Sequence, residues 1–160
     1  MKKVTVITPY YRGEKTIFNT INSVFNSYEN VKDEINLEYI VIIDSMEDKD
    51  KIFKKLKNEY KDKIILLKNQ ENLGVAKSRN KAIKLATGDY VIFLDQDDNL
   101  DKNYFTYIKN NIEADSKVIL VNGYICNKVN GKKAPLYYVR PKLRRKTFLR
   151  ANKISTPGQV

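Results

Sequence analysis

The sequence contains no histidine and a single cysteine, Cys126. Without imidazole groups, Ser-His-Asp triads, histidine bases and histidine-ligated zinc sites are excluded. One thiol forms no internal disulfide, so we expect a cytoplasmic protein. Any acid–base or metal chemistry of this chain must therefore rest on carboxylates.

Long apolar runs are also missing. No stretch of the sequence approaches the roughly 18 consecutive apolar residues that a membrane-spanning helix needs. The apolar run that begins at Val4 is too short for a signal peptide and ends at Pro9, so it predicts a first strand. With 160 residues, 42% hydrophobic, the chain is long and apolar enough for one domain. We expect a single domain over 1–160, with an α/β core over 1–127 and a hairpin and basic tail over 128–160.

Acidic residues are absent after Asp115. The basic residues beyond it account for the whole net charge of +11: Lys117, Lys128, Lys132, Lys133, Arg140, Lys142, Arg144, Arg145, Lys146, Arg150 and Lys153. The positive charge therefore belongs to one end of the chain.

Strand and helix patterns alternate along the chain. Strands are predicted over 3–8, 37–43, 64–67, 90–94 and 118–121, and helices over 14–28, 52–60, 75–86 and 104–112. We expect Ala76, Ala82, Ile83 and Ala86 to form the inner face of the third helix, and Gly88 to end it in the left-handed conformation. The β-α-β-α order predicts an α/β fold with a mostly parallel, doubly wound sheet flanked by helices.

The last third of the chain carries weaker patterns. Asn130-Gly131 predicts a hairpin turn between strands over 124–129 and 135–139, and a short helix is expected over 147–151.

The strand over 90–94 runs directly into Asp95, Gln96, Asp97 and Asp98. Its continuous apolar residues predict a strand buried on both faces. Ligands of open α/β sheets bind at the carboxyl ends of such strands. Asp95 and Asp97 are therefore placed to hold a divalent cation through oxygen ligands. Since the glycine-rich phosphate loops G-x-G-x-x-G and G-x-x-x-x-G-K are both absent, such a metal would neutralise a bound diphosphate.

Other interpretations of these acids were weighed. Asp97, Asp98 and Asn99 would suit the cap of the next helix. A calcium loop fails because Leu100 stands where glycine is required. An aspartyl-phosphate phosphatase fails because its later acids are missing after Asp115. Helix capping remains the alternative to metal binding.

Further polar groups follow the other strands. Tyr11 and Glu14 come after the first, Asp44 ends the second, and Arg79 lies on the helix before the fourth. A carboxylate can accept a pyrimidine N–H, a tyrosine ring can stack on a base, and arginine can bind a phosphate or a base carbonyl. The alternatives are core packing for Tyr11, a cap at Asp44 and a solvated Arg79.

Together these segments resemble the nucleotide-sugar-binding half of an inverting family 2 glycosyltransferase with the GT-A fold. The matching segments are 7–14, 39–44, 72–80 and 88–98. The resemblance implies that the side chains around the nucleotide base are Pro9, Tyr11, Glu14, Asp44 and Arg79.

The same resemblance implies the chemistry of the acids. Asp95 would lie near the ribose and the metal, and Asp97 would ligate a Mn²⁺ or Mg²⁺ ion that bridges the diphosphate. The implied reaction transfers a sugar from a nucleoside-diphosphate sugar, most often a UDP-sugar, to the hydroxyl of a glycan or lipid-linked acceptor. That activity is typical of polysaccharide biosynthesis.

Two features depart from the family pattern. Ser45 and Met46 stand where a second acid and a glycine usually follow the strand-two aspartate, which predicts altered base recognition. In addition, residues 152–160 resemble the segment that leads into the acceptor side. We therefore expect the general base to lie beyond Val160, because no acid follows Asp115.

The basic segment over 139–150 admits four interpretations: a solvated tail, a contact with the anionic inner face of the membrane, a contact with an acidic acceptor or a diphosphate, and a nucleic-acid surface. The rival function for the chain is thus a non-catalytic basic binding module for a membrane or nucleic acid. We expect no nucleic acid, because the aromatic residues of this segment are not interleaved as a stacking platform.

Overall fold

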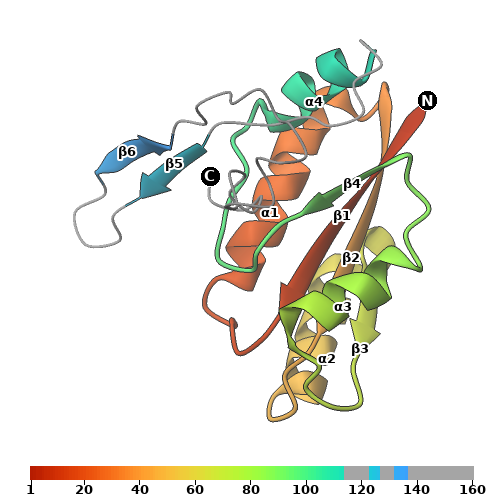
Figure 1. Ribbon diagram of the computed structural model, residues 1–160, viewed down its shortest axis with the longest axis vertical. Coiled ribbons are helices and arrows are strands. Elements are labelled where there is room, and N and C mark those ends of the chain that lie inside the picture. The colour runs from red at the N-terminus through yellow and green to blue at the C-terminus, as the bar shows by residue number, and fades with distance from the viewer. Residues whose placement is uncertain (114–122, 127–131, 137–160) are drawn as a thin grey trace, which may run out of the picture.

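The computed structural model describes residues 1–113, 123–126 and 132–136 (Figure 1). Four parallel strands form one sheet in the order β3-β2-β1-β4. The strands are β1 (Lys2–Tyr10), β2 (Ile35–Ile43), β3 (Ile65–Lys68) and β4 (Tyr90–Phe93). The helices are α1 (Ile17–Tyr28), α2 (Lys49–Tyr60), α3 (Gly74–Ile83) and α4 (Tyr104–Glu113), with short 3-10 turns η1 (Glu29–Val31) and η2 (Lys61–Lys63). The predicted α/β fold with a parallel sheet is confirmed.

Both faces of the sheet are covered, because side chains alternate along each strand. On β1, Val4, Val6 and Tyr10 pack in the larger core with α1, α2 and α4. Ile7 points to the other face and packs against Ala82 of α3. Figure 1 shows α3 across the sheet from α1 and α2. This layering leaves the carboxyl edge of the sheet as the place where the loops meet.

The inner face of α3 differs from the prediction. Ser78 and Ala82 are its fully buried residues, whereas Ala76 is exposed and the Ile83 side chain is 41% exposed. Hydrophobicity misled the prediction here: the face that approaches the sheet carries small residues, and the buried hydroxyl of Ser78 accepts a hydrogen bond from Asn69 Nδ2 at 2.9 Å.

Gly88 does not end α3, which stops at Ile83, and the positive φ among the described glycines belongs to Gly74, at 77°. A Cβ at Gly88 would lie 2.5 Å from Thr5 Oγ1 and 2.8 Å from Thr5 N. Glycine is therefore required at this position by the close approach of β1, and the predicted helix cap is wrong.

β4 is the other correction. Val91 is 40% exposed, so the strand is not buried on both faces, and within the described residues β4 lies at the edge of the sheet.

The first helix also begins later than predicted, at Ile17, because the carbonyl of Gly13 accepts from both Thr16 N and Ile17 N in the preceding turn.

Two short strands, β5 (Gly123–Cys126) and β6 (Lys133–Leu136), pair antiparallel. The predicted strand over 118–121, the Asn130-Gly131 turn, the helix over 147–151 and the basic segment over 139–150 lie outside the described residues. Among the helices that are described, none has the length and apolar character needed to cross a membrane.

The amino end of the sheet is held by Glu38 of β2. Its carboxylate accepts hydrogen bonds from Thr5 Oγ1 at 2.8 Å and from Thr87 N at 2.9 Å, and it pairs with Lys3 Nζ at 2.9 Å. Burial raises the pKa of Glu38, but the hydrogen bonds from Thr87, Lys3 and Thr5 outweigh it and lower the pKa to about 2. This network ties the α3–β4 connection to β1 and β2 at the end opposite the site.

Candidate functional site

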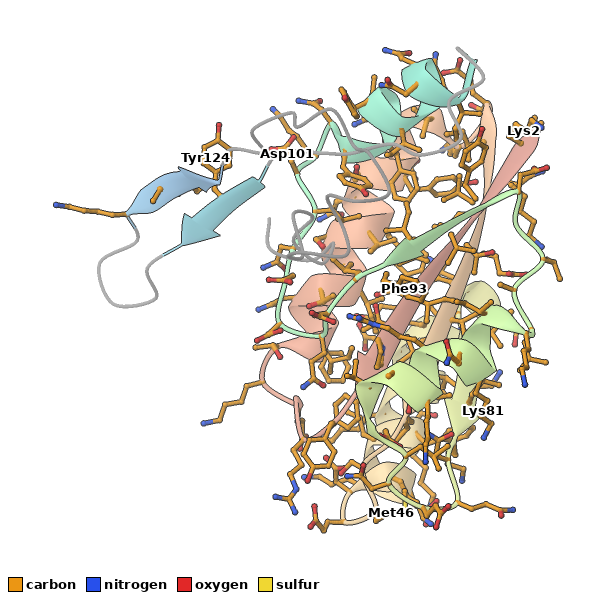
Figure 2. The ribbon with its side chains drawn as sticks, in the orientation of Figure 1. Lys2, Met46, Lys81, Phe93, Asp101 and Tyr124 are labelled. Carbon is orange, nitrogen blue, oxygen red and sulfur yellow. The ribbon has the colours of Figure 1, made fainter. Side chains whose placement is uncertain are left out.

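A cavity of about 500 Å³ opens at the carboxyl edge of the sheet. Figure 2 shows this end of the molecule at Met46, which follows β2, and the opposite end at Lys2, which begins β1. The lining comes from the ends of β1, β2 and β4 and from the start of α3: Pro9, Tyr10, Tyr11, Asp44, Asn72, Gly74, Val75, Asp95, Gln96 and Asp97. Five of the residues predicted from the sequence, Pro9, Tyr11, Asp44, Asp95 and Asp97, therefore face one cavity.

Asp95 is bound by Arg79. The Arg79 Nη2 atom of α3 donates to Asp95 Oδ1 just beyond the end of β4. The guanidinium carbon lies over the Phe93 ring, 5.2 Å from its centroid, a cation–π contact (Figure 2 labels Phe93 beside α3). Arg79 Nε is buried and finds no hydrogen-bond partner among the described residues. Arg79 is thus not part of the cavity lining, and it neutralises one of the two lining acids that follow β4.

Asp97 has a different environment. Its side chain is exposed at the cavity, and no hydrogen bond or ion pair to it is found within residues 1–113. The preceding turn is closed by Asp98 N, which donates to the Asp95 carbonyl at 3.1 Å. Asp97 is therefore available to a ligand.

These acids do not cap the next helix. α4 begins at Tyr104, and the capping contacts come from Asp101, whose Oδ1 accepts from Asn103 N at 2.9 Å and whose carbonyl accepts from Tyr104 N at 2.9 Å. The capping alternative for Asp97, Asp98 and Asn99 is wrong, because helix α4 starts several residues after them.

The donor set fits a hard cation that takes part of its coordination from a ligand. In the part of the chain that the structure describes, no three acidic or thiol side chains cluster to enclose a metal ion. Among residues 1–113 no group bonds to the carboxylate of Asp97, and Asp95 Oδ1 accepts from Arg79. Mg²⁺ is commonly held by one or two carboxylates together with substrate phosphates, and the pair Asp95 and Asp97 is suited to that arrangement.

Asp44 organises the loop before α3. Its Oδ1 accepts from Asn69 Nδ2 at 2.7 Å and from Leu73 N at 2.8 Å, and its Oδ2 accepts from Gly74 N at 2.8 Å. The side chain is only 3% exposed, yet it lines the cavity. Asp44 therefore acts as a cap for the start of α3 and also lines the cavity.

Glu14 is not brought to the cavity. Its carboxylate pairs with Lys51 Nζ at 3.0 Å and with Lys55 on α2. Hydrogen bonds from Lys55 and Lys51 lower the pKa of Glu14. The structure thus separates Glu14 from Pro9 and Tyr11, with which the sequence grouped it.

Tyr11 presents its ring to solvent. The side chain is 44% exposed, and the Arg12 guanidinium lies 5.1 Å from the ring centroid. Since the ring is not packed in the core, the core-packing alternative for Tyr11 is wrong. Tyr10, in contrast, is buried; its hydroxyl donates to Asp48, and burial followed by this acid raises the pKa of Tyr10.

Sequence reasoning gave no site role to five of the lining residues: Tyr10, Asn72, Gly74, Val75 and Gln96. Gln96 was passed over as the spacer between two acids, and Val75 as an ordinary helical residue. A polar amide between two acids at a sheet edge was the available signal for Gln96. Nothing in the pattern of α3 marks Val75, because its place follows from the loop that Asp44 holds.

Comparison with known proteins identifies the family of this chain. The family model described as glycosyl transferase family 2 matches residues 5–159. The chain belongs to glycosyl transferase family 2. This family 2 chain is 35% identical over 117 residues to an uncharacterized glycosyltransferase of Methanocaldococcus jannaschii, covering 69% of this chain and 38% of that protein. It is 32% identical over 132 residues to the UDP-Glc:alpha-D-GlcNAc-diphosphoundecaprenol beta-1,3-glucosyltransferase of Escherichia coli, covering 72% of this chain and 49% of that protein.

Solved structures agree with the family assignment. The crystal structure of Staphylococcus aureus TarS 1–349 in complex with UDP-GlcNAc matches with a TM-score of 0.66 and 30% identity, over 87% of this chain and 38% of that one. This family 2 chain therefore spans half or less of the length of these relatives.

Proposed function

We propose that this chain provides the donor-binding part of a metal-dependent, inverting glycosyltransferase that uses a nucleoside-diphosphate sugar. The cavity at the carboxyl edge of the sheet carries the proposal, because it brings together aromatic and carboxylate groups that are far apart in the sequence, with Arg79 bonded to one of the carboxylates from outside the cavity lining. The complex of the related TarS with UDP-GlcNAc supports UDP as the nucleotide.

The base would bind between Pro9, Tyr11 and Asp44. The exposed Tyr11 ring offers a stacking surface, and the free lone pair of Asp44 Oδ2 can accept the N–H of a uracil. Because Asp44 is fixed by three donors, its oxygen would meet the base without reorganisation.

The diphosphate would lie toward Asp97. With a divalent cation bound there, negative charge on the departing diphosphate is stabilised, an effect typically worth several kcal/mol. The described side chains contribute position and charge balance: Asp97 supplies ligand oxygens, and Arg79 reduces the negative charge that Asp95 would otherwise present to a phosphate.

The acceptor would be the hydroxyl of a glycan or of a lipid-linked sugar. Names of the relatives support this class, since they include a diphosphoundecaprenol glucosyltransferase and a minor teichoic acid biosynthesis protein of Bacillus subtilis. Inversion requires attack from the face opposite the diphosphate, with a carboxylate to take the hydroxyl proton. We assign that base to no residue of this chain.

The proposal also includes a cytoplasmic location and a contact of residues 139–150 with the inner face of the membrane.

Titration with UDP tests the proposal. Calorimetry with and without Mn²⁺ should show tighter binding with the metal, and Asp97→Asn should remove that gain. Asp33→Asn is the matched control, because Asp33 is an exposed acid next to the amino end of β2. UDP binding that is unaffected by Mn²⁺ and by Asp97→Asn would contradict the proposal.

A further inference from the structure

Gln96 lies between the two acids, and its side chain is bonded in both directions to the backbone of Tyr11. Tyr11 N donates to Gln96 Oε1 at 2.8 Å, and Gln96 Nε2 donates to the Tyr11 carbonyl at 2.7 Å. A primary amide offers a donor and an acceptor side by side, so it can replace one rung of a β-ladder. This contact satisfies both polar groups of the Tyr11 backbone.

Two neighbours fix Gln96 further. Thr20 Oγ1 of α1 donates to the Gln96 carbonyl at 2.7 Å. A Cβ added at Gly13 would lie 2.3 Å from Gln96 Oε1 and 2.4 Å from its Cδ. Thr20 thus holds the backbone of Gln96, and Gly13 leaves the space that the side-chain amide fills.

The Gln96–Tyr11 contact lies beyond the last backbone hydrogen bond between β1 and β4. The pairing of β1 with β4 ends at Ile7 and Phe93, with a last backbone bond from Leu94 N to the Ile7 carbonyl at 3.0 Å. Beyond that bond, the β1–α1 loop carries Tyr11 and the loop after β4 carries Asp97. Gln96 connects these loops, and all three residues line the cavity.

We propose that Gln96 is a positioning residue that sets the separation between the base-binding loop at Tyr11 and the diphosphate-binding acid Asp97. This inference rests on the proposed function. One ligand must reach both loops, so its base and its metal-bound diphosphate can bind together at full strength only when the loops are in register. Loss of Gln96 therefore weakens the advantage that metal gives to UDP.

The measured quantity is the ratio of the UDP dissociation constants without and with Mn²⁺. Gln96→Ala should lower this ratio about tenfold, which corresponds to about 1.4 kcal/mol. Gly13→Ala should act in the same direction, because it displaces the amide while leaving Gln96 in the chain. The double variant should be no worse than Gln96→Ala alone, since the smaller side chain makes room for the new Cβ.

Gln70→Ala is the matched control, an exposed glutamine in the loop before α3. A merely structural role would lower the melting temperature or the fraction of chain that binds, but it would leave the ratio unchanged. Exchange of the Tyr11 amide, followed by NMR, should become faster in Gln96→Ala and stay unchanged in Gln70→Ala.

The outcomes separate the two proposals. If the unmodified chain binds UDP in a metal-dependent way but the ratio is unchanged in both Gln96→Ala and Gly13→Ala, only the proposed role of Gln96 is overturned. If the unmodified chain shows no measurable affinity for UDP, the proposed function is overturned, and the role of Gln96 is overturned with it.

Discussion

Arg79 of α3 donates a hydrogen bond to Asp95 immediately after β4, with its guanidinium against the ring of Phe93. The two cavity acids that follow β4, Asp95 and Asp97, are therefore not equivalent. Asp95 has a built-in positive partner, whereas Asp97 has none among residues 1–113. This asymmetry divides the site into a neutralised acid and a free one, and it makes the following predictions specific.

Arg79→Met should weaken UDP binding without metal about tenfold, because an uncompensated Asp95 would repel the diphosphate. With Mn²⁺ present the loss should be smaller, since the cation supplies the missing positive charge. Calorimetry under both conditions measures this difference. Lys77→Met is the control, because Lys77 is an exposed cation on the same helix; equal effects of the two variants would contradict a specific role for Arg79.

Asp44→Asn should destabilise the protein by about 1–3 kcal/mol, because an amide cannot accept all three of the hydrogen bonds that the carboxylate receives from Asn69, Leu73 and Gly74. Urea unfolding measures the change, with Asp33→Asn as the exposed control. Stability equal to that of the control would show that the loop before α3 does not depend on Asp44.

Glu14→Gln should leave UDP affinity within about twofold of the unmodified chain, because Lys51 and Lys55 hold this carboxylate outside the cavity. Titration with UDP and Mn²⁺ provides the measurement. A loss comparable to that of Asp97→Asn would instead mean that Glu14 leaves its lysines to contact the nucleotide.

The free energy of unfolding should decrease as the pH is lowered, in part because of Glu38. Its pKa is about 2 in the folded protein, below its ordinary value of 4.5, so its contribution to stability is fully present above pH 4.5 and is lost as the pH drops through about 2. The shift in pKa corresponds to a contribution on the order of 3 kcal/mol, and solvent screens little of it because the side chain is only 7% exposed. Urea midpoints between pH 6 and pH 2.5 should decline less steeply in Glu38→Gln than in the control Glu71→Gln. Parallel slopes in the two variants would exclude Glu38 as the cause.

Much of the site could be predicted from the sequence, because parallel strands bring their carboxyl ends to one edge. Pro9, Tyr11, Asp44, Asp95 and Asp97 follow β1, β2 and β4, and they share the cavity for that reason. Their roles as ligands for the base, ribose and metal remain predictions.

What the sequence could not predict depends on contacts between distant segments. Glu14 was grouped with Tyr11 by proximity in the chain, but the lysines of α2 hold it elsewhere. The amide of Gln96 occupies the space left by Gly13, and this contact could not be predicted because neither residue belongs to a periodic pattern. The buried face of α3 was misjudged because Ser78, a polar residue, is satisfied there by Asn69.

The three hydrogen bonds received by Asp44 have a consequence for any attempt to change which nucleotide this cavity accepts. Selection for a new base at this position would act on folding and recognition at once, so most substitutions would be discarded before their specificity could be observed. Libraries aimed at donor choice should therefore begin at Tyr11 and Val75, whose side chains are exposed, and should reach Asp44 only in a background that has been stabilised beforehand.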